Sequence, residues 1–256
     1  MGANLYAERF SKVRKKFIFA ILVTASIECV FAFESPTFLP YGGQQVREED
    51  GVSIMRAYSL PLLGTAKYGN GDKTLGPVNI NAPKGGSIRF WSLGSFDCLN
   101  PYLLTGNAAT GWFYVVQALM QSTLNDYYTR YPMIAKYAEY PMSNQWVDFF
   151  LDERAHWQDG TPLTAEDVVF SFNALTGKNA KYFKNYFRDM DHIEQRGPFQ
   201  VRFWFKDPSN RESIIIASEM PVFSANAYKT KDFSKADLTP IMGSGPYKYK
   251  SISAGR

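Results

Sequence analysis

The chain has 256 residues, of which 45% are hydrophobic and 20% are charged, so it can bury a sizeable core. Its 28 basic and 24 acidic residues give a net charge of +4, and no basic tract follows the first residues, which excludes the surface that a nucleic-acid-binding protein needs. Two cysteines, Cys29 and Cys98, exclude a disulfide-rich scaffold.

Residues 1–32 have the pattern of a secretory signal peptide. Five basic residues precede an apolar run that begins at Phe17, and a cleavage site follows at residues 30–32. The alternative is an uncleaved membrane anchor, but the run has about 15 residues and contains Glu28, short of the ~20 that a spanning helix needs. We expect export with cleavage near Ala32, which leaves a mature chain of net charge +1.

The next segments alternate between loop and strand patterns. Residues 33–56 show no periodicity and include the charged run at 47–50, so we expect a flexible leader there. Proline and glycine make residues 81–86 a loop. Residues 87–93 read as a strand with alternating faces, and residues 94–100 form the loop after it.

The middle of the chain contains both helix and strand patterns. Apolar residues at helical spacing predict an amphipathic helix over residues 107–120. Residues 146–151 read as a short strand, and residues 192–205 as a hairpin that turns at 196–198, with Val201, Phe203 and Phe205 facing inward. Helices mixed with hairpins predict an α/β (mixed α+β) domain.

Residues 155–176 predict a turn followed by a capped helix. Asp159 and Gly160 are a turn pair, and Pro162 fixes the backbone for a change of direction. Thr164 is a good N-cap, because its hydroxyl can accept from free N–H groups of the first turn, and Asp167 places negative charge at the positive end of the helix.

Neither catalytic nor metal-binding residues are arranged in a known pattern. His156 and His192 are the only imidazole bases, and neither lies in a catalytic motif. The segment Gly243-Ser-Gly-Pro-Tyr247 has the wrong spacing for a G-x-S-x-G elbow, so we interpret it as a tight glycine turn into a strand. The mature chain has two histidines and one cysteine, which lie far apart in the sequence, and this disfavours a zinc site. We expect no enzyme, no metal and no cofactor.

The segment from Trp157 to Ser171 resembles the signature of periplasmic solute-binding proteins of the peptide and nickel class, family 5, which reads W-x-D-G-x-P-x-T-A-x-D-V-V-F-S. The residues that match are Trp157, Asp159, Gly160, Pro162, Thr164, Ala165, Asp167, Val168, Val169, Phe170 and Ser171. Further stretches are similar to the YejA-like oligopeptide-binding branch, namely residues 81–86, 92–97, 99–106 and 243–247. The resemblance covers roughly residues 57–256.

This resemblance implies a periplasmic component of an ABC transporter that binds oligopeptides and delivers them to an inner-membrane permease and its ATPase. In this family the loop after the first strand lies near the ligand, which makes Ser95, Phe96, Asp97 and Asn100 the candidate ligand-binding residues. Ser95 and Asn100 would donate to peptide carbonyls, and Asp97 would either accept from an amine or structure its own loop. The signature residues would be structural.

The resemblance also implies that the sequence covers one lobe. In the family, the Gly243–Tyr247 motif lies near the crossover into the second lobe, and members are roughly twice this length. We therefore expect residues 57–256 to be the N-terminal lobe of a two-lobed type II periplasmic-binding-protein fold, apparently truncated. Two alternatives stay open: another cargo, such as nickel, haem or an antibiotic peptide, and a non-transporting envelope remnant.

Overall fold

The fold is described by a computed structural model for residues 40–253, except residues 71, 73, 77, 84 and 178–180. The signal-peptide prediction and the first part of the expected leader lie outside these residues. The chain divides between Phe38 and Leu39 into two units, and the elements below all belong to the second unit.

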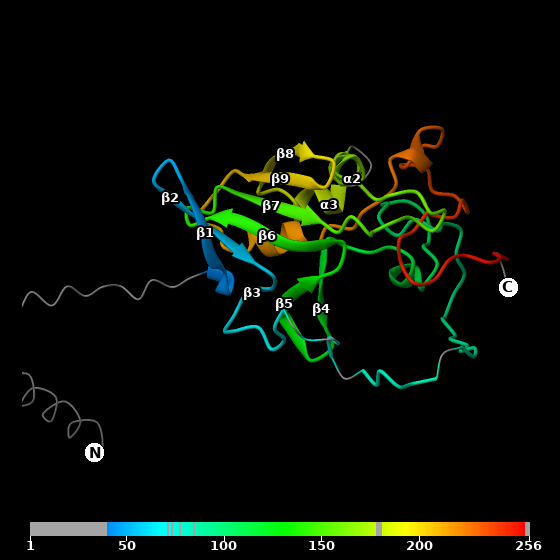
Figure 1. Ribbon diagram of the computed structural model, residues 1–256. Helices are drawn as coiled ribbons and strands as arrows, with labels where there is room; N and C mark the ends of the chain where they lie inside the picture. The colour runs from blue at the N-terminus through cyan, green and yellow to red at the C-terminus, as the bar shows by residue number, and fades with distance from the viewer. Residues whose placement is uncertain are drawn as a thin grey trace, which may run out of the picture. The chain divides into compact units, whose positions relative to one another are not determined.

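A six-stranded antiparallel sheet forms the main layer of this unit, and Figure 1 shows four of its strands, β6, β7, β9 and β8, side by side. In spatial order its strands are β1 (Gln44–Glu49), β2 (Val52–Ala57), β6 (Ala135–Pro141), β7 (Trp146–Leu151), β9 (Gln200–Phe205) and β8 (Met190–Gly197). The strand predicted at 146–151 and the hairpin predicted at 192–205 are confirmed as β7 and β8–β9.

A smaller sheet and short helices complete the described part of the unit. The sheet has the order β3 (Leu60–Pro61), β5 (Asp126–Pro132) and β4 (Met120–Thr123). The helices are η1 (Pro40–Gly42), η2 (Trp112–Tyr114), α2 (Ala165–Thr176), α3 (Lys181–Tyr186), α4 (Ser213–Ser218) and η3 (Asn226–Tyr228). None of the helices in these ranges is long and apolar enough to cross a membrane. The mixed α/β prediction is confirmed.

The core lies between helix α2 and one face of the six-stranded sheet. Val168 and Leu175 are fully buried, and Phe172 meets Phe203 edge-on at a ring distance of 6.2 Å. Val201, Phe203 and Phe205 are buried as the alternation of the second hairpin strand predicts. The apolar stripe of α2 therefore has a sheet to cover, and tertiary packing supports the helix that the sequence predicts.

Charged residues cross the opposite face of this sheet in register. Arg56 pairs with Glu139, Glu139 with Asp148, and Asp148 with Arg202. Arg56 donates to Glu139 at 2.6 and 2.8 Å, and Arg202 donates to Asp148 at 2.7 and 2.8 Å, although both carboxylates are fully buried. Buried carboxylates are tolerated only with such partners, so these pairs fix the register of the sheet.

The predicted flexible leader is wrong from Pro40 onward. Strands β1 and β2 form a hairpin that turns at Asp50 and Gly51, both with positive φ, and β2 pairs with β6. The charged residues that favoured disorder have partners in the sheet, because Arg47 bonds to the buried carboxylate of Glu139. The compact unit therefore includes residues before 57.

The strand predicted at residues 87–93 is also wrong. This stretch has no regular secondary structure, and its apolar side chains are exposed, with Phe90 at 68% and Trp91 at 88%. A strand needs a neighbour for its main-chain hydrogen bonds, and none of the described strands pairs with these residues.

The helix predicted at residues 107–120 is replaced by the short helix η2 and the start of β4. Gly111 has a φ of 94°, which an α-helix does not allow. The carbonyls of Tyr114 and Val115 accept from Tyr247 and Gly245, far along the chain. The apolar residues at the end of this stretch are buried as the pattern predicts, but their backbone is not the α-helix that the pattern predicts.

Candidate functional site

The signature begins with a tight turn. The carbonyl of Trp157 accepts from Gly160 at 2.9 Å, and that of Thr161 accepts from Trp157 at 2.8 Å. Gly160 has a φ of 87°, a conformation that favours glycine, and Pro162 bridges back to His156. The Asp159 carboxylate accepts from the Thr161 hydroxyl at 2.7 Å and the Thr161 N–H at 2.9 Å, and these bonds lower the pKa of Asp159.

Asp167 joins three separate parts of the chain. One of its buried oxygens accepts from the indole N–H of Trp157 at 3.2 Å and from the backbone N–H of Thr164, the N-cap, at 2.9 Å. The other oxygen accepts from the N–H of Ala225 at 2.8 Å. This carboxylate ties the turn to the start of α2 and to a segment almost 60 residues further on.

The Gly243–Tyr247 segment needs its two glycines for close backbone contact. A Cβ atom on Gly243 or Gly245 would overlap the carbonyl oxygen of Val115. Gly245 instead donates to that oxygen at 2.8 Å, and Gln158 donates to the carbonyl of Gly245 at 3.2 Å. The predicted glycine turn is thus held against the signature turn, whereas the strand expected after it is absent from residues 248–253.

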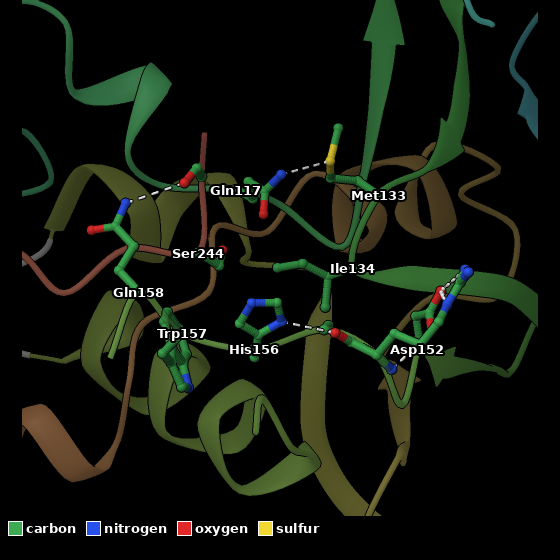
Figure 2. Close-up of a pocket in the computed structure, with 11 residues that line it drawn as sticks. Gln117, Met133, Ile134, Asp152, His156, Trp157, Gln158 and Ser244 are labelled. Carbon is green, nitrogen blue, oxygen red and sulfur yellow. Dashed lines mark hydrogen bonds and ion pairs between the residues drawn. The ribbon is translucent and has the colours of Figure 1, made fainter. Parts of the chain in front are cut away.

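A hollow of about 390 Å³ lies beside this contact, and Figure 2 shows it. Ser244 and Gln158 lie on one side of it and Asp152 on the other, with His156 and Ile134 between them. Its lining residues are Gln117, Met133, Ile134, Asp152, Arg154, Ala155, His156, Trp157, Gln158, Ser244 and Gly245. We call it the turn hollow.

The structure separates the four candidate ligand-binding residues into two pairs. Ser95 is exposed and Phe96 is half-buried, and both line a second hollow. Asp97 instead accepts from the N–H of Asn107 at 2.6 Å. Asn100 is buried, accepts from the N–H of Tyr102 at 3.0 Å and donates to the carbonyl of Phe233 at 3.1 Å. The last two side chains therefore hold loops together.

The second hollow has a volume of about 590 Å³ and is lined by stretches of chain that lie far apart in the sequence, and we call it the loop hollow. One wall is residues 92–96, the other is Tyr249 with residues 251–253, and residues 107–110 also line it. Within the described chain, no backbone–backbone hydrogen bond is made by residues 85–96 or by residues 248–253. The described main-chain groups of these two stretches therefore have no backbone partner.

Sequence reasoning missed the second wall. Residues 248–253 lie about 150 positions after the first wall, and nothing in their spacing links them to it. Tyr249 is half-buried, which raises its pKa above the usual range for tyrosine. The one usable signal was the pair of glycines before it, which indicated a close backbone approach but not to which segment.

Comparison with known proteins places this geometry in context. The profile of bacterial extracellular solute-binding proteins, family 5 Middle, matches residues 129–256. A protein named probable peptide-binding protein YejA, from Agrobacterium fabrum, is 34% identical over 203 residues, which are 77% of this chain and 33% of that protein. The peptidoglycan-binding protein YepA from the same organism is 32% identical over 213 residues, 78% of this chain and 35% of that one.

Solved structures agree at the level of the fold. The oligopeptide-binding protein AppA from Bacillus subtilis, in complex with a nonapeptide, has a TM-score of 0.51 at 18% identity and covers 64% of this chain and 34% of its own. NikA from Brucella suis has a TM-score of 0.52 at 20% identity, with 61% and 32% covered. These are type II periplasmic binding proteins. The chain spans about a third of the length of the curated relatives it matches.

Proposed function

The chain belongs to the bacterial extracellular solute-binding proteins of family 5, and on that premise we propose that it binds oligopeptides in the periplasm for import by an ABC transporter. Proteins of this family bind substrates and are not enzymes. The ligand would be passed unchanged to an inner-membrane permease, with the energy supplied by the ATPase of that permease.

The observation that carries the proposal is the unpaired main chain on both walls of the loop hollow. An extended peptide is recognised by its backbone when it lies beside a free strand edge, because its N–H and C=O groups then complete the ladder. Residues 92–96 and 251–253 both line one space, and neither segment makes a backbone–backbone hydrogen bond in the described chain. Its volume of about 590 Å³ lies within the ~300–1,000 Å³ usual for ligand sites.

The side chains at this hollow fit a ligand that varies in sequence. Small residues such as Gly94, Ala108 and Ser251 keep the backbone accessible, while Phe96 and Tyr249 supply rigid aromatic surface. In this proposal Ser95 and Phe96 contact the peptide, and Asp97 and Asn100 position the loop that carries them. The six lining residues named here, Gly94, Ser95, Phe96, Ala108, Tyr249 and Ser251, bring no charge, so the backbone of the ligand would matter more than the identity of its side chains.

The names of the relatives support a peptide rather than another cargo. One is named for peptide binding and another for peptidoglycan binding, and peptidoglycan contains short peptides. The nickel and opine proteins among the solved structures share the fold at 20–22% identity, which is too low to infer that this chain binds the same ligands.

We further propose that the described unit is the first of two lobes. The relatives are about three times as long as the part matched, which leaves room for a second lobe that closes over the ligand. The intact mass of the protein isolated from the periplasm tests this. A mass well above that of residues 33–256 supports two lobes in one chain. A mass equal to that of a chain that ends at Arg256 contradicts the two-lobe proposal.

The peptide proposal is tested with the protein purified from the periplasm and a synthetic pentapeptide library. We expect bound peptides to be recovered by mass spectrometry, and Ser95→Trp to reduce recovery because the indole fills the hollow. Ser143→Trp is the matched control, since Ser143 is an exposed turn residue between β6 and β7. Equal recovery from both variants, or recovery of a metal complex in place of peptides, contradicts the proposal.

A further inference from the structure

The turn hollow has polar groups that its own surroundings leave without good partners. The hydroxyl oxygen of Ser244 is buried, and no described residue hydrogen-bonds to it. Among the described residues, the amide nitrogen of Gln117 donates only to the sulfur of Met133, at 2.9 Å, and a thioether is a weak acceptor. Buried polar groups in folded proteins are nearly always paired, so these two are suited to a ligand with amide groups.

The opposite end of the turn hollow carries an exposed cation, Arg154, which is paired with Asp152. Arg154 donates from Nε at 3.0 Å and from Nη2 at 2.6 Å to the two oxygens of Asp152. This leaves Nη1 without a hydrogen-bond partner among the described residues, and the side chain is 90% exposed. A guanidinium that pairs with one carboxylate in this way can bind a second one through its free edge.

An apolar strip joins the two ends. Figure 2 shows Ile134 and the His156 ring between Ser244 and Asp152, and Met133 and Ala155 also line this space. The imidazole is fixed, because its Nδ1 lies 2.9 Å from the carbonyl of Arg154. Amide-binding groups, a short apolar strip and a cation thus follow one another along a hollow of about 390 Å³.

We propose that the turn hollow is a second binding site, separate from the loop hollow, which takes the carboxyl-terminal end of a short peptide. The terminal carboxylate binds Arg154, the last side chains lie on Ile134 and Met133, and a peptide carbonyl accepts from Ser244 and Gln117. Asp152 positions Arg154 and does not touch the ligand. This site does not depend on the loop hollow, because no residue lines both.

The two histidines of the chain provide a reporter and its internal reference. His156 lies in the turn hollow, whereas His192 lies on β8, held by Asp191 at 2.7 Å and stacked on Trp204. Proton–carbon NMR of the imidazole Cε1–H groups therefore follows the site with two signals. The probes are N-acetyl-Ala-Ala and its C-terminal amide, which differ only in the carboxylate.

With the mature protein, we expect N-acetyl-Ala-Ala to shift the His156 signal in a saturable way and to leave His192 unmoved. The amide probe should bind about tenfold more weakly, since hydrogen bonds to charged groups contribute more than neutral ones. Arg154→Ala should weaken the acid by the same factor and leave the amide unaffected. Arg188→Ala is the matched control, because Arg188 is also exposed and pairs with a neighbouring aspartate.

Three results would overturn the proposal: no shift of His156, equal shifts of both histidines, or equal affinity for the acid and the amide. Ser95→Trp separates this site from the proposed transport function. If that variant loses library peptides but keeps the His156 response, the two sites are distinct. Loss of both responses in this variant contradicts a separate site.

Discussion

The signature region and the walls of the loop hollow differ in how their polar groups are satisfied. In the signature, the Asp167 carboxylate alone accepts three hydrogen bonds, and Trp157 and Leu163 are fully buried. Along residues 85–96 and 248–253, described main-chain groups lack backbone partners, and large apolar side chains such as Leu93 are exposed. In the first region side-chain and backbone groups are paired with one another, whereas in the second the described main-chain groups have no backbone partner.

This difference indicates that most of the recognisable segment serves the fold, and that the proposed transport site lies elsewhere. Trp157, Gly160, Pro162 and Asp167 use their side chains or backbone angles to hold the turn, the helix cap and the core together. The segments with open hydrogen-bonding groups have little sequence pattern. Removing groups from the first region should therefore cost stability, and removing them from the second should cost ligand affinity.

The largest expected effect is at the buried ion pair of the sheet. Asp148→Ala leaves the Arg202 guanidinium largely buried without its carboxylate, and we expect a loss of about 3–5 kcal/mol in the free energy of unfolding. Urea denaturation followed by circular dichroism measures it. Arg188→Ala, at an exposed pair, should change stability by less than about 0.5 kcal/mol. Similar values for the two variants would mean that burial does not govern these pairs.

The signature carboxylate should come next. Asp167→Ala removes one acceptor from three donors, two of them backbone N–H groups, so we expect a loss of about 3 kcal/mol. Glu166→Ala is the control, since it changes the adjacent, exposed residue of the same helix turn. If both variants unfold at the same urea concentration, the structural role assigned to Asp167 is wrong.

A smaller effect on stability should distinguish the residue that holds the predicted loop in place from the residue that contacts the ligand. Asn100→Ala should cost about 1–2 kcal/mol, because the carbonyl of Phe233 and the N–H of Tyr102 lose their partner. Ser95→Ala should leave stability within about 0.5 kcal/mol and lower the affinity for library peptides. Thermal unfolding and peptide recovery, measured on both variants, separate the two roles. A stability loss in Ser95→Ala, without loss of peptide, would reverse the assignment.

The smallest effect concerns pH. Hydrogen bonds from Thr161 lower the pKa of Asp159, so the folded protein holds this proton more weakly than the unfolded chain does. The stabilisation is present at neutral pH and is lost as the pH falls below about 4. A carbon NMR titration should give a midpoint below 3.8 for Asp159 and a higher one in Thr161→Val, which keeps the N–H donor but loses the hydroxyl. An unchanged midpoint would exclude the hydroxyl as the cause.

The sequence predicted elements well where the pattern and the local backbone agree. Helix α2 has a cap, an apolar stripe and no breaker before Gly177, and the β8–β9 hairpin has a turn between two alternating strands. Residues 107–120 have the apolar spacing of a helix, but no α-helix forms there. Gly111 has a positive φ, and the carbonyls of Tyr114 and Val115 accept hydrogen bonds from residues far along the chain. Spacing alone does not reveal such long-range pairing.

The candidate site was only half predictable for a related reason. The loop after the predicted strand supplied Ser95 and Phe96, which line the loop hollow, and the bond from Asn107 to Asp97 agrees with the alternative that Asp97 structures its own loop. Nothing local indicated that Asn100 bonds to Tyr102 and Phe233. The charged β1–β2 hairpin was mistaken for a disordered leader, because its partner Glu139 lies more than 80 residues away. In each case the missing information was the identity of a distant neighbour.

The most direct test of the central claim is amide hydrogen exchange of the mature protein with and without the pentapeptide library. If peptide backbones pair with the walls of the loop hollow, protection should rise at residues 85–96 and 248–253. Exchange across helix α2, residues 165–176, which lines neither hollow, should stay as it is. Protection confined to other segments, or no change at the two walls under conditions where peptide is bound, would contradict the account.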